Sequence, residues 1–342
     1  MVSTLGKRLV ACLLNVSEAR RKDLVVKVAQ AAITNSNGGW RAGTTVLNIF
    51  NDFDYNRSVI TIVASIDHIR EAVLSACEQA CGLIDMSGHS GVHPCLGAVD
   101  LVPLYPLGEE VNLEDCAREA KALASELTQR VEGTSAFFFG WADTPQRRGL
   151  AQRRKEMGWF KKDPNMTSVQ ADLGPPPQKR FGLTGVGASP YVMNCNVTIG
   201  TQDLALGRRV AAALRESSPG GIPGVQVLAL PHEGEVEIAC NVEAIQQAAF
   251  KPPPPPTPSS VAGSGASSSP SWPSFNIGGQ IYCHAPASLI TARVAELAGR
   301  DGVATKGTAL VGFTPVECRG LAEQALSLGI GEFWKERKKV HM

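Results

Sequence analysis

Apolar residues in the first 140 positions follow two different periods, one typical of strands and one typical of helices. Short apolar and β-branched runs predict strands at residues 8–14, 45–49, 59–63, 98–105 and 136–139. Apolar residues spaced three or four apart predict helices at residues 18–32, 69–84 and 113–131. Asn15 or Ser17 is expected to cap the first of these helices, and Asn112 the third. The order β-α-β-β-α-β, followed by one helix and one strand, is typical of a ferredoxin-like unit.

The remainder of the chain repeats this order of elements. Strands are expected at residues 191–197, 225–230, 236–242 and 309–313. Helices are expected at residues 202–216, with Thr201 near the start, and at residues 286–297 and 315–327. Residues 251–274 hold a run of five prolines followed by Ser, Gly and Ala. Because such a composition cannot bury a core, we expect a disordered insertion there.

The predicted fold class is therefore α/β (α+β). We expect two ferredoxin-like subdomains, with mixed or antiparallel sheets and helices packed on a face of each. A length of 342 residues fits two domains of ordinary size. The first subdomain is placed at residues 1–185 and the second at residues 186–330.

Charge and cysteine usage narrow the class of protein. The 33 Lys and Arg against 32 Asp and Glu leave a net charge of +1, so no global field favours nucleic acid or a membrane. The nine cysteines are odd in number and lie mostly in apolar runs, which indicates buried thiols in a reducing compartment. No apolar stretch approaches the about 20 residues that a membrane span needs. We expect a cytoplasmic protein that does not bind a membrane.

Residues 141–180 are locally basic, with nine Lys and Arg against four Asp and Glu. A solvated helix face and linker is the usual interpretation of such a run, and a basic wall facing an anionic small molecule is the alternative. RNA binding is the least favoured hypothesis, because sheets of this type stack bases on exposed strand aromatics. The strands of the first half carry no aromatic pair in that pattern.

The segment richest in chemistry is residues 83–100, LIDMSGHSGVHPCLGAVD, which places two of the six histidines four apart in a glycine-rich loop. A histidine suits proton transfer at neutral pH. From the residues alone, three interpretations stay open for His89 and His93. They are general acid/base catalysis, a structural role through hydrogen bonds to the backbone, and a metal site that includes Cys95, for which no fourth ligand is evident.

This segment resembles the signature of the formiminotransferase N-terminal subdomain family, LIDMS-H-x-G-x-HPR-MGA-D. The match runs from Leu83 to Asp100 and includes His89, Gly91, His93 and Pro94. Shorter family patterns follow in the same order. N-F-S-E, N-R-[ST]-V, Y-G-x-A, D-F-G-P and N-x-N are similar to residues 15–18, 56–59, 139–142, 172–175 and 194–196. The resemblance covers about the first 200 residues.

The resemblance implies two α/β subdomains with a ligand cleft between them, and an enzyme that transfers a one-carbon group. The formimino group, or in related members a formyl group, would pass between N-formimino-L-glutamate and N5 of tetrahydrofolate, the cosubstrate. No metal and no nucleic acid would take part, and the protein would be a homodimer. Its partners would be the folate and the small glutamate-derived donor.

The resemblance also implies site residues. The histidine before proline is the catalytic acid/base of the family, which falls on His93. Substrate-binding residues would be Asp54, Asn56, Arg57 and His89. The folate loop would comprise Gly174, Pro175, Pro176, Pro177, Gln178, Lys179, Arg180, Phe181 and Gly182.

The sequence departs from the family pattern at three cations. The arginine that follows His-Pro is Cys95 here, and the later Gly-Ala-Arg-Lys pattern reads Gly187, Ala188, Ser189 and Pro190. Cations beside an anionic ligand contribute about 1–3 kcal/mol each when they make buried hydrogen bonds. An alternative hypothesis is therefore a paralogue that binds folate and has weak or no turnover.

Overall fold

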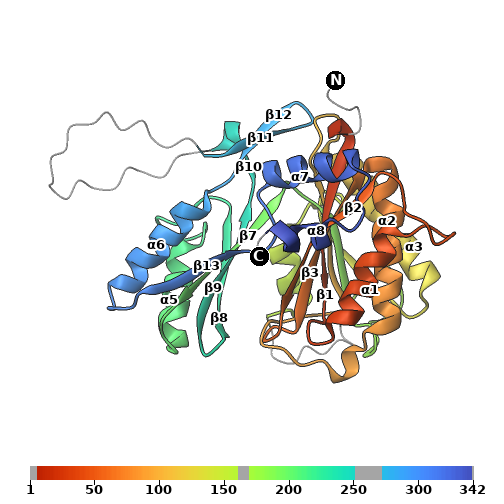
Figure 1. The fold of residues 1–342 in the computed structure, drawn as a ribbon. Helices are drawn as coiled ribbons and strands as arrows, with labels where there is room; N and C mark the ends of the chain where they lie inside the picture. The colour runs from red at the N-terminus through yellow and green to blue at the C-terminus, as the bar shows by residue number, and fades with distance from the viewer. Residues whose placement is uncertain (1–5, 161–168, 251–271, 341–342) are drawn as a thin grey trace. The chain divides into compact units, whose positions relative to one another are not determined.

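The computed structural model describes residues 6–160, 169–250 and 272–340 (Figure 1). The predicted disordered insertion at residues 251–274 therefore lies outside the described residues up to position 271. The chain forms two compact units. Unit 1 comprises Met1–Tyr191, Ile277–Gly279 and Val311–Met342, and unit 2 comprises Val192–Asn276 and Gln280–Leu310. The expected subdomain boundary at residues 185 and 186, and the cleft between the subdomains, stay predictions.

Unit 1 is built on one six-stranded sheet with the strand order β2-β3-β1-β4-β6-β5. Its strands are β1 (Leu9–Val16), β2 (Thr44–Asp52), β3 (Arg57–Ser65), β4 (Val99–Pro106), β5 (Ala136–Gly140) and β6 (Thr184–Ala188). The four strands from β2 to β4 pair antiparallel, whereas β6 is parallel to both β4 and β5. This places the first and last strands of the β-α-β-β-α-β unit side by side at the centre, as the ferredoxin-like prediction requires.

Six helices belong to unit 1 in the described part of the chain. They are α1 (Lys22–Ile33), α2 (Ile66–Leu83), α3 (Leu113–Arg130), α4 (Leu150–Glu156), α7 (Pro315–Ser327) and α8 (Phe333–Val340). Helices α1, α2 and α3 lie side by side over the sheet, and α7 and α8 contact β2 (Figure 1). The described part of unit 1 also contains the short 3-10 helices η1 (Gly6–Arg8) and η2 (Met86–Gly88).

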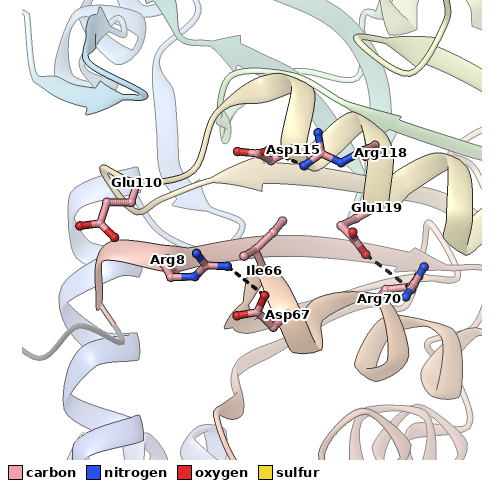
Figure 2. Close-up of a pocket in the computed structure, with 8 residues that line it drawn as sticks. All are labelled: Arg8, Ile66, Asp67, Arg70, Glu110, Asp115, Arg118 and Glu119. Carbon is pink, nitrogen blue, oxygen red and sulfur yellow. Dashed lines mark hydrogen bonds and ion pairs between the residues drawn. The ribbon is translucent and has the colours of Figure 1, made fainter.

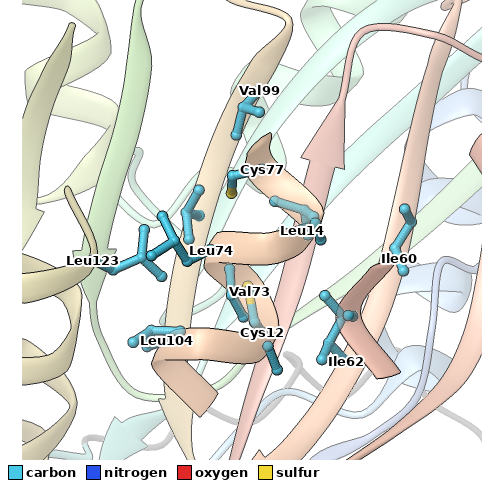
Figure 3. Packing of buried hydrophobic residues seen from close by; sticks show 14 of the residues in the cluster. Cys12, Leu14, Ile60, Ile62, Val73, Leu74, Cys77, Val99, Leu104 and Leu123 are labelled. Atoms are coloured by element: carbon cyan, nitrogen blue, oxygen red, sulfur yellow. The ribbon is translucent and has the colours of Figure 1, made fainter. Parts of the chain in front are cut away.

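The core of unit 1 lies between its helices and the sheet. Val73, Leu74 and Cys77 of α2 are fully buried together with Cys12 and Leu14 of β1 (Figure 3). Fully burying an apolar side chain of this size stabilises the fold by about 1.5–3 kcal/mol. All nine cysteines are free thiols, and eight of them are buried. Cys77 and Cys81, with exposed fractions of 0% and 2%, are among the buried thiols that the sequence predicts.

Unit 2 repeats the ferredoxin-like order on a four-stranded antiparallel sheet, β13-β7-β9-β8. Its elements are β7 (Val192–Ile199), α5 (Leu204–Leu214), β8 (Val225–His232), β9 (Glu235–Glu243), α6 (Ala287–Gly299) and β13 (Thr305–Leu310). A small second sheet consists of β10 (Ile245–Gln246), β11 (Ser274–Ile277) and β12 (Gln280–Cys283). The 3-10 helix η4 (Gln247–Ala249) follows β10. The alternating buried residues of β7 pack against α5 and α6, so helices cover one face. The predicted α+β fold class is confirmed.

The predicted start of the first helix was wrong. Helix α1 begins at Lys22, and neither Asn15 nor Ser17 caps it. Ser17 Oγ instead donates to Gly97 O (2.7 Å), and Asn15 Nδ2 donates to Leu13 O (2.7 Å). The Glu18 carboxylate accepts the backbone N–H groups of Arg20 and Arg21 before the helix. The expected cap of the third helix is confirmed, because Asn112 and Asp115 form a capping box at α3.

Several boundaries in unit 2 also differ from the prediction, and the starts of β13 and α5 differ for a clear physical reason. Strand β13 begins at Thr305 rather than at residue 309, because it is an edge strand whose exposed polar residues give no apolar signal. Helix α5 begins at Leu204, two residues later than expected, and its cap is Asp203, which accepts the N–H groups of Ala205 and Leu206. Thr201, which was expected near the helix start, accepts the N–H of the capping residue Asp203 with its Oγ1. No helix within the described ranges is both long and apolar enough to cross a membrane.

Gly182 joins two segments that are far apart in the sequence. It has φ +68°, and a Cβ built on it would lie 1.9 Å from Leu96 O. The backbone of this region is tied by hydrogen bonds from Leu183 N to Leu96 O (2.8 Å) and from Ala98 N to Phe181 O (2.9 Å). Only glycine permits both the left-handed conformation and this close approach.

We therefore predict that Gly182→Ala lowers the stability of the protein more than Gly38→Ala. Both glycines have positive φ, but a Cβ on Gly38 would meet nothing within 4 Å. The control should cost about 1–2 kcal/mol for the backbone conformation alone, and Gly182→Ala should cost at least about 2 kcal/mol more because Leu96 must move. Urea unfolding of the two variants measures the difference, and equal midpoints would contradict the close contact.

Candidate functional site

The histidine-rich loop lies between α2 and β4, and it is fixed to the end of β1. The N–H of Ser17, the residue after β1, donates to Ala98 O (3.0 Å). On the other side, Val92 N donates to Asp54 O (3.0 Å) in the turn between β2 and β3. A Cβ on Gly91 would lie 2.1 Å from Tyr55 O, so only glycine allows the loop to approach this turn. The motif therefore folds onto the residues that the sequence analysis assigned to substrate binding.

Asp100 is the charged centre of the site. Its carboxylate pairs with Arg57 of β3 and accepts the backbone N–H of Leu96 (2.6 Å). Arg154 of α4 also approaches it, with Nη2 3.7 Å from Oδ2. The exposed fractions of these side chains are 1% for Asp100, 8% for Arg57 and 9% for Arg154. Among the described residues, two buried guanidiniums thus pair with one carboxylate, which leaves one positive charge in excess.

The pKa shifts of this group follow from burial and from its charges. Burial opposes the charged form of Asp100, but Arg57 and Arg154 outweigh it and lower the pKa of the carboxyl. Burial likewise opposes the charged form of Arg57, and Asp100 still raises the pKa of this side chain. For Arg154 burial prevails, since its carboxylate is farther away, and the pKa falls to about 10. Both arginines are charged at neutral pH.

His93 lies beside this charged group in a defined tautomer. Its Nδ1 is 2.8 Å from Pro94 O. Because a carbonyl oxygen only accepts, Nδ1 carries the proton and Nε2 keeps its lone pair. Burial, followed by the charges of Arg57 and Arg154, lowers the pKa of His93 to about 3. The half-buried His93 is therefore a neutral base at physiological pH.

Aromatic rings flank His93 on two sides. Tyr55 lies with its ring centroid 5.2 Å from that of His93, and Trp159 meets His93 edge to face at 5.5 Å. The Arg154 guanidinium stacks over Trp159, 4.5 Å from the ring centroid. These contacts restrict the rotation of the imidazole.

Asn56 and His89 hold the loop from the other side. Asn56 has φ +48°, accepts the N–H of Ala19 (3.1 Å) and donates to Ser90 O (3.2 Å). Its Nδ2 also lies 3.4 Å from His89 Nδ1. His89 Nε2 is buried and has no hydrogen-bond partner in the described structure. The residues expected to bind substrate were Asp54, Asn56, Arg57 and His89. In the structure Asn56 positions the histidine-rich loop and Arg57 positions Asp100. All four expected residues lie in this loop or close to it.

The expected folate loop, residues 174–182, lies against the same segment. Arg180 O accepts the N–H of Met86 (2.9 Å), while the Arg180 side chain pairs with Asp85 (3.4 Å) and reaches the last carbonyls of α2. Lys179 and most of the loop are exposed, whereas Pro177 and Gly182 are buried. The two segments that the resemblance singled out are therefore neighbours in space.

Arg154 and Trp159 were missed by the sequence analysis, which assigned Asp100 no role either. They come from the basic stretch, whose spacing gives no sign of which arginine turns inward. Arg153, the adjacent residue, is fully paired elsewhere, with Glu156, Asp172 and Phe138 O.

Cys95 Sγ lies 3.5 Å from Arg57 Nη1, and burial raises the pKa of this thiol. Across the described residues, no group of three or more His, Cys, Asp or Glu side chains could hold a metal ion.

A polar hollow of about 470 Å³ lies beside the start of β1 (Figure 2). Arg8 at its wall precedes β1, whereas the His93 loop meets the end of β1 at Val16. Its lining residues are Arg8, Ile66, Asp67, Arg70, Glu110, Asp115, Arg118 and Glu119. Ion pairs between Arg8 and Asp67, Arg70 and Glu119, and Arg118 and Asp115 neutralise most of this charge. The remaining carboxylate, Glu110, pairs with Lys7 (3.3 Å), so the hollow offers no surplus charge for a ligand.

The lowered pKa of His93 predicts a pH dependence of stability. An unfolded histidine titrates near pH 6.5, so between about pH 6.5 and 3 the unfolded chain binds a proton that the folded chain does not. Stability must then fall as pH decreases through this window. Between pH 7.5 and pH 5, wild type should lose about 1–2 kcal/mol more than His93→Gln. Urea unfolding at both pH values measures this, and equal losses would contradict a neutral, half-buried His93.

Known proteins resemble the chain over most of its length. Glutamate formimidoyltransferase of Thermoplasma acidophilum is 28% identical over 239 residues, which is 68% of this chain and 76% of that protein. A formiminotransferase cyclodeaminase-like protein of Arabidopsis thaliana is 30% identical over 256 residues, 70% of this chain and 83% of that protein. Formimidoyltransferase-cyclodeaminase of Gallus gallus is 30% identical over 69% of this chain, which is 44% of its own length.

A family profile identifies the region that carries this similarity. The profile described as the formiminotransferase domain, N-terminal subdomain, matches residues 9–189. This span runs from the first residue of β1 to the end of β6, and it contains His93, Arg57, Asp100, Arg154 and Trp159. It covers more than half of the chain and falls within unit 1. The chain thus belongs to the formiminotransferase family.

Proposed function

We propose that this protein is a tetrahydrofolate-dependent transferase that moves the formimino group of N-formimino-L-glutamate to N5 of tetrahydrofolate. Membership of the formiminotransferase family and the names of the relatives support a transferase of this class. The observation that carries the proposal is His93, a neutral imidazole with Nδ1 held at Pro94 O and Nε2 left to exchange protons.

The proposed reaction needs one proton to move between two nitrogens. When N5 of tetrahydrofolate bonds to the amidine carbon, it must lose its proton, and when the bond from that carbon to the glutamate nitrogen breaks, that nitrogen must gain one. His93 Nε2 accepts the first proton and returns it in the second step, so the products are 5-formiminotetrahydrofolate and L-glutamate. A positioned histidine contributes about 10²–10⁴-fold to such a step.

The other site residues bind and orient in this proposal. Asp54, Asn56, Arg57 and His89 would bind the donor, with Arg57 held in place by Asp100. The folate would contact the 174–182 loop, where Lys179 and Arg180 offer positive charge to its glutamate carboxylates. The Arg180 side chain is 47% exposed, so it can exchange Asp85 for a ligand carboxylate. A formyl group is the alternative cargo, and we further propose a cytoplasmic homodimer that needs no metal.

The direct test follows a ¹³C-labelled formimino group from N-formimino-L-glutamate by NMR in the presence of (6S)-tetrahydrofolate. We expect the label to move to the folate as an equal amount of L-glutamate is released. Folate binding without transfer would favour the alternative of a folate-binding paralogue, and absence of folate binding would contradict the proposed function altogether.

His93→Gln should lower kcat by about 10²–10⁴-fold because it removes the imidazole that is proposed to exchange the proton. Folate affinity, measured by calorimetry, should stay within about twofold of wild type, since the variant keeps the loop and its charges. The matched control is His68→Gln, which removes a histidine of α2 that hydrogen-bonds Ser65. Near-normal turnover of His93→Gln would rule out this role.

A further inference from the structure

The indole N–H of Trp159 is a buried donor without an acceptor. Trp159 is 3% exposed, and its Nε1 has no hydrogen-bond partner among the described residues. Leaving a buried N–H unpaired costs about 1–3 kcal/mol, so most buried donors in folded proteins are satisfied. An acceptor supplied by a ligand is one way to offset this cost.

The surroundings of Trp159 point to an anionic acceptor. The ring lies against the His93 imidazole, and the Arg154 guanidinium stacks over it. Arg154 is also the less well paired of the two buried arginines, because its shortest contact with Asp100 is 3.7 Å. An indole with an unpaired N–H and an incompletely compensated cation therefore lie in contact with each other beside His93.

The comparison with neighbouring residues shows that this arrangement is specific. Arg153 precedes Arg154 in α4 and is also buried, yet it pairs with both Glu156 and Asp172. Trp141 carries a similar stacked arginine, Arg147, but there the guanidinium is 53% exposed and pairs with Glu114. Of these arginines, only Arg154 is both buried and stacked on an indole whose N–H lacks an acceptor in the described structure.

We infer that Arg154 and the Trp159 N–H together bind the α-carboxylate of the amino-acid donor. This inference rests on the proposed function. A carboxylate supplies both the acceptor and the negative charge that the two side chains lack. In N-formimino-L-glutamate the transferred group is on the nitrogen of Cα, which also carries the α-carboxylate, so that carboxylate lies close to the reacting carbon. The carboxylates of tetrahydrofolate lie beyond the aminobenzoyl ring, far from N5.

This position also connects binding to catalysis. The excess positive charge of Arg57 and Arg154 helps to lower the pKa of His93 far below the working pH, which makes it a weak base in the free protein. A bound carboxylate would offset one of these charges and raise the pKa of His93 when the donor is in place. The correct donor would thus activate the base that acts on it.

The test uses Trp159→Phe, which keeps an aromatic ring but removes the N–H, and Arg154→Gln, which removes the charge. Each should raise KM for N-formimino-L-glutamate about tenfold or more, as expected for a lost hydrogen bond to a charged group. KM for tetrahydrofolate should stay near wild type. Trp141→Phe and Arg147→Gln are the matched controls and should leave both constants unchanged.

Calorimetry with glutamate analogues tests the inference without turnover. Wild type should bind L-glutamate and L-glutamine, which keep the α-carboxylate, more tightly than the α-amide of glutamate. Arg154→Gln should weaken the first two about tenfold and change the α-amide little, because the α-amide lacks the negative charge that pairs with Arg154, which isolates the interaction by a double-mutant argument. Trp159→Phe should weaken all three, because an amide carbonyl also accepts a hydrogen bond. Thermal melts confirm that the variants fold, since a phenylalanine or glutamine fits the space.

The outcomes separate the inference from the proposed function. Unchanged donor KM and unchanged glutamate affinity in both variants would overturn the inference, as would a wild type that binds no glutamate. A rise in KM for tetrahydrofolate alone would assign the carboxylate to the folate and overturn the donor assignment. If wild type transfers no formimino group but binds glutamate through Arg154 and Trp159, only the proposed function fails.

Discussion

The buried carboxylate of Asp100 is the interaction on which the rest of the site depends. It accepts the N–H of Leu96, which fixes the end of the histidine loop, and it pairs with Arg57 at the start of β3. It also draws Arg154 inward from a stretch that is otherwise basic and exposed. Leaving one member of a buried ion pair uncompensated costs about 3–5 kcal/mol. Loop position, the inward arginines and the electrostatic field at His93 therefore all follow from one side chain.

The fold was largely predictable because its signals are local. Buried strands and amphipathic helices alternate with clear periods, and the β-α-β-β-α-β order leads to the same strand arrangement in both units. The prediction failed where local signals are weak. β13 is an exposed edge strand with polar residues, so its start was missed. The polar residues before α1 were predicted to cap the helix. Ser17 instead donates its hydroxyl hydrogen bond to Gly97 O, a residue far away in the sequence.

The site was predictable in part, and the missing part has a physical reason. His93 and the loops around it were identified by their resemblance to short family motifs. Such motifs can be recognised from a continuous stretch of sequence. Arg154 and Trp159 reach the site from a helix and turn that follow β5, and nothing in their spacing distinguishes them from the solvated charges beside them. Their burial is set by the sheet and by Asp100, which only the folded chain reveals. The family arginine that is replaced by Cys95 is therefore not the only source of positive charge, since Arg154 supplies a second cation beside Arg57.

The central claim is that His93 is a neutral base whose Nδ1 carries the proton and whose Nε2 faces the reaction. The most direct measurement is a ¹⁵N–¹H NMR titration of the protein with ¹⁵N-labelled histidine, with His93→Gln used for assignment. The account predicts a neutral His93 with the proton on Nδ1 from pH 8 down to pH 5. A proton on Nε2, or a titration midpoint near the ordinary value of about 6.5, would contradict it.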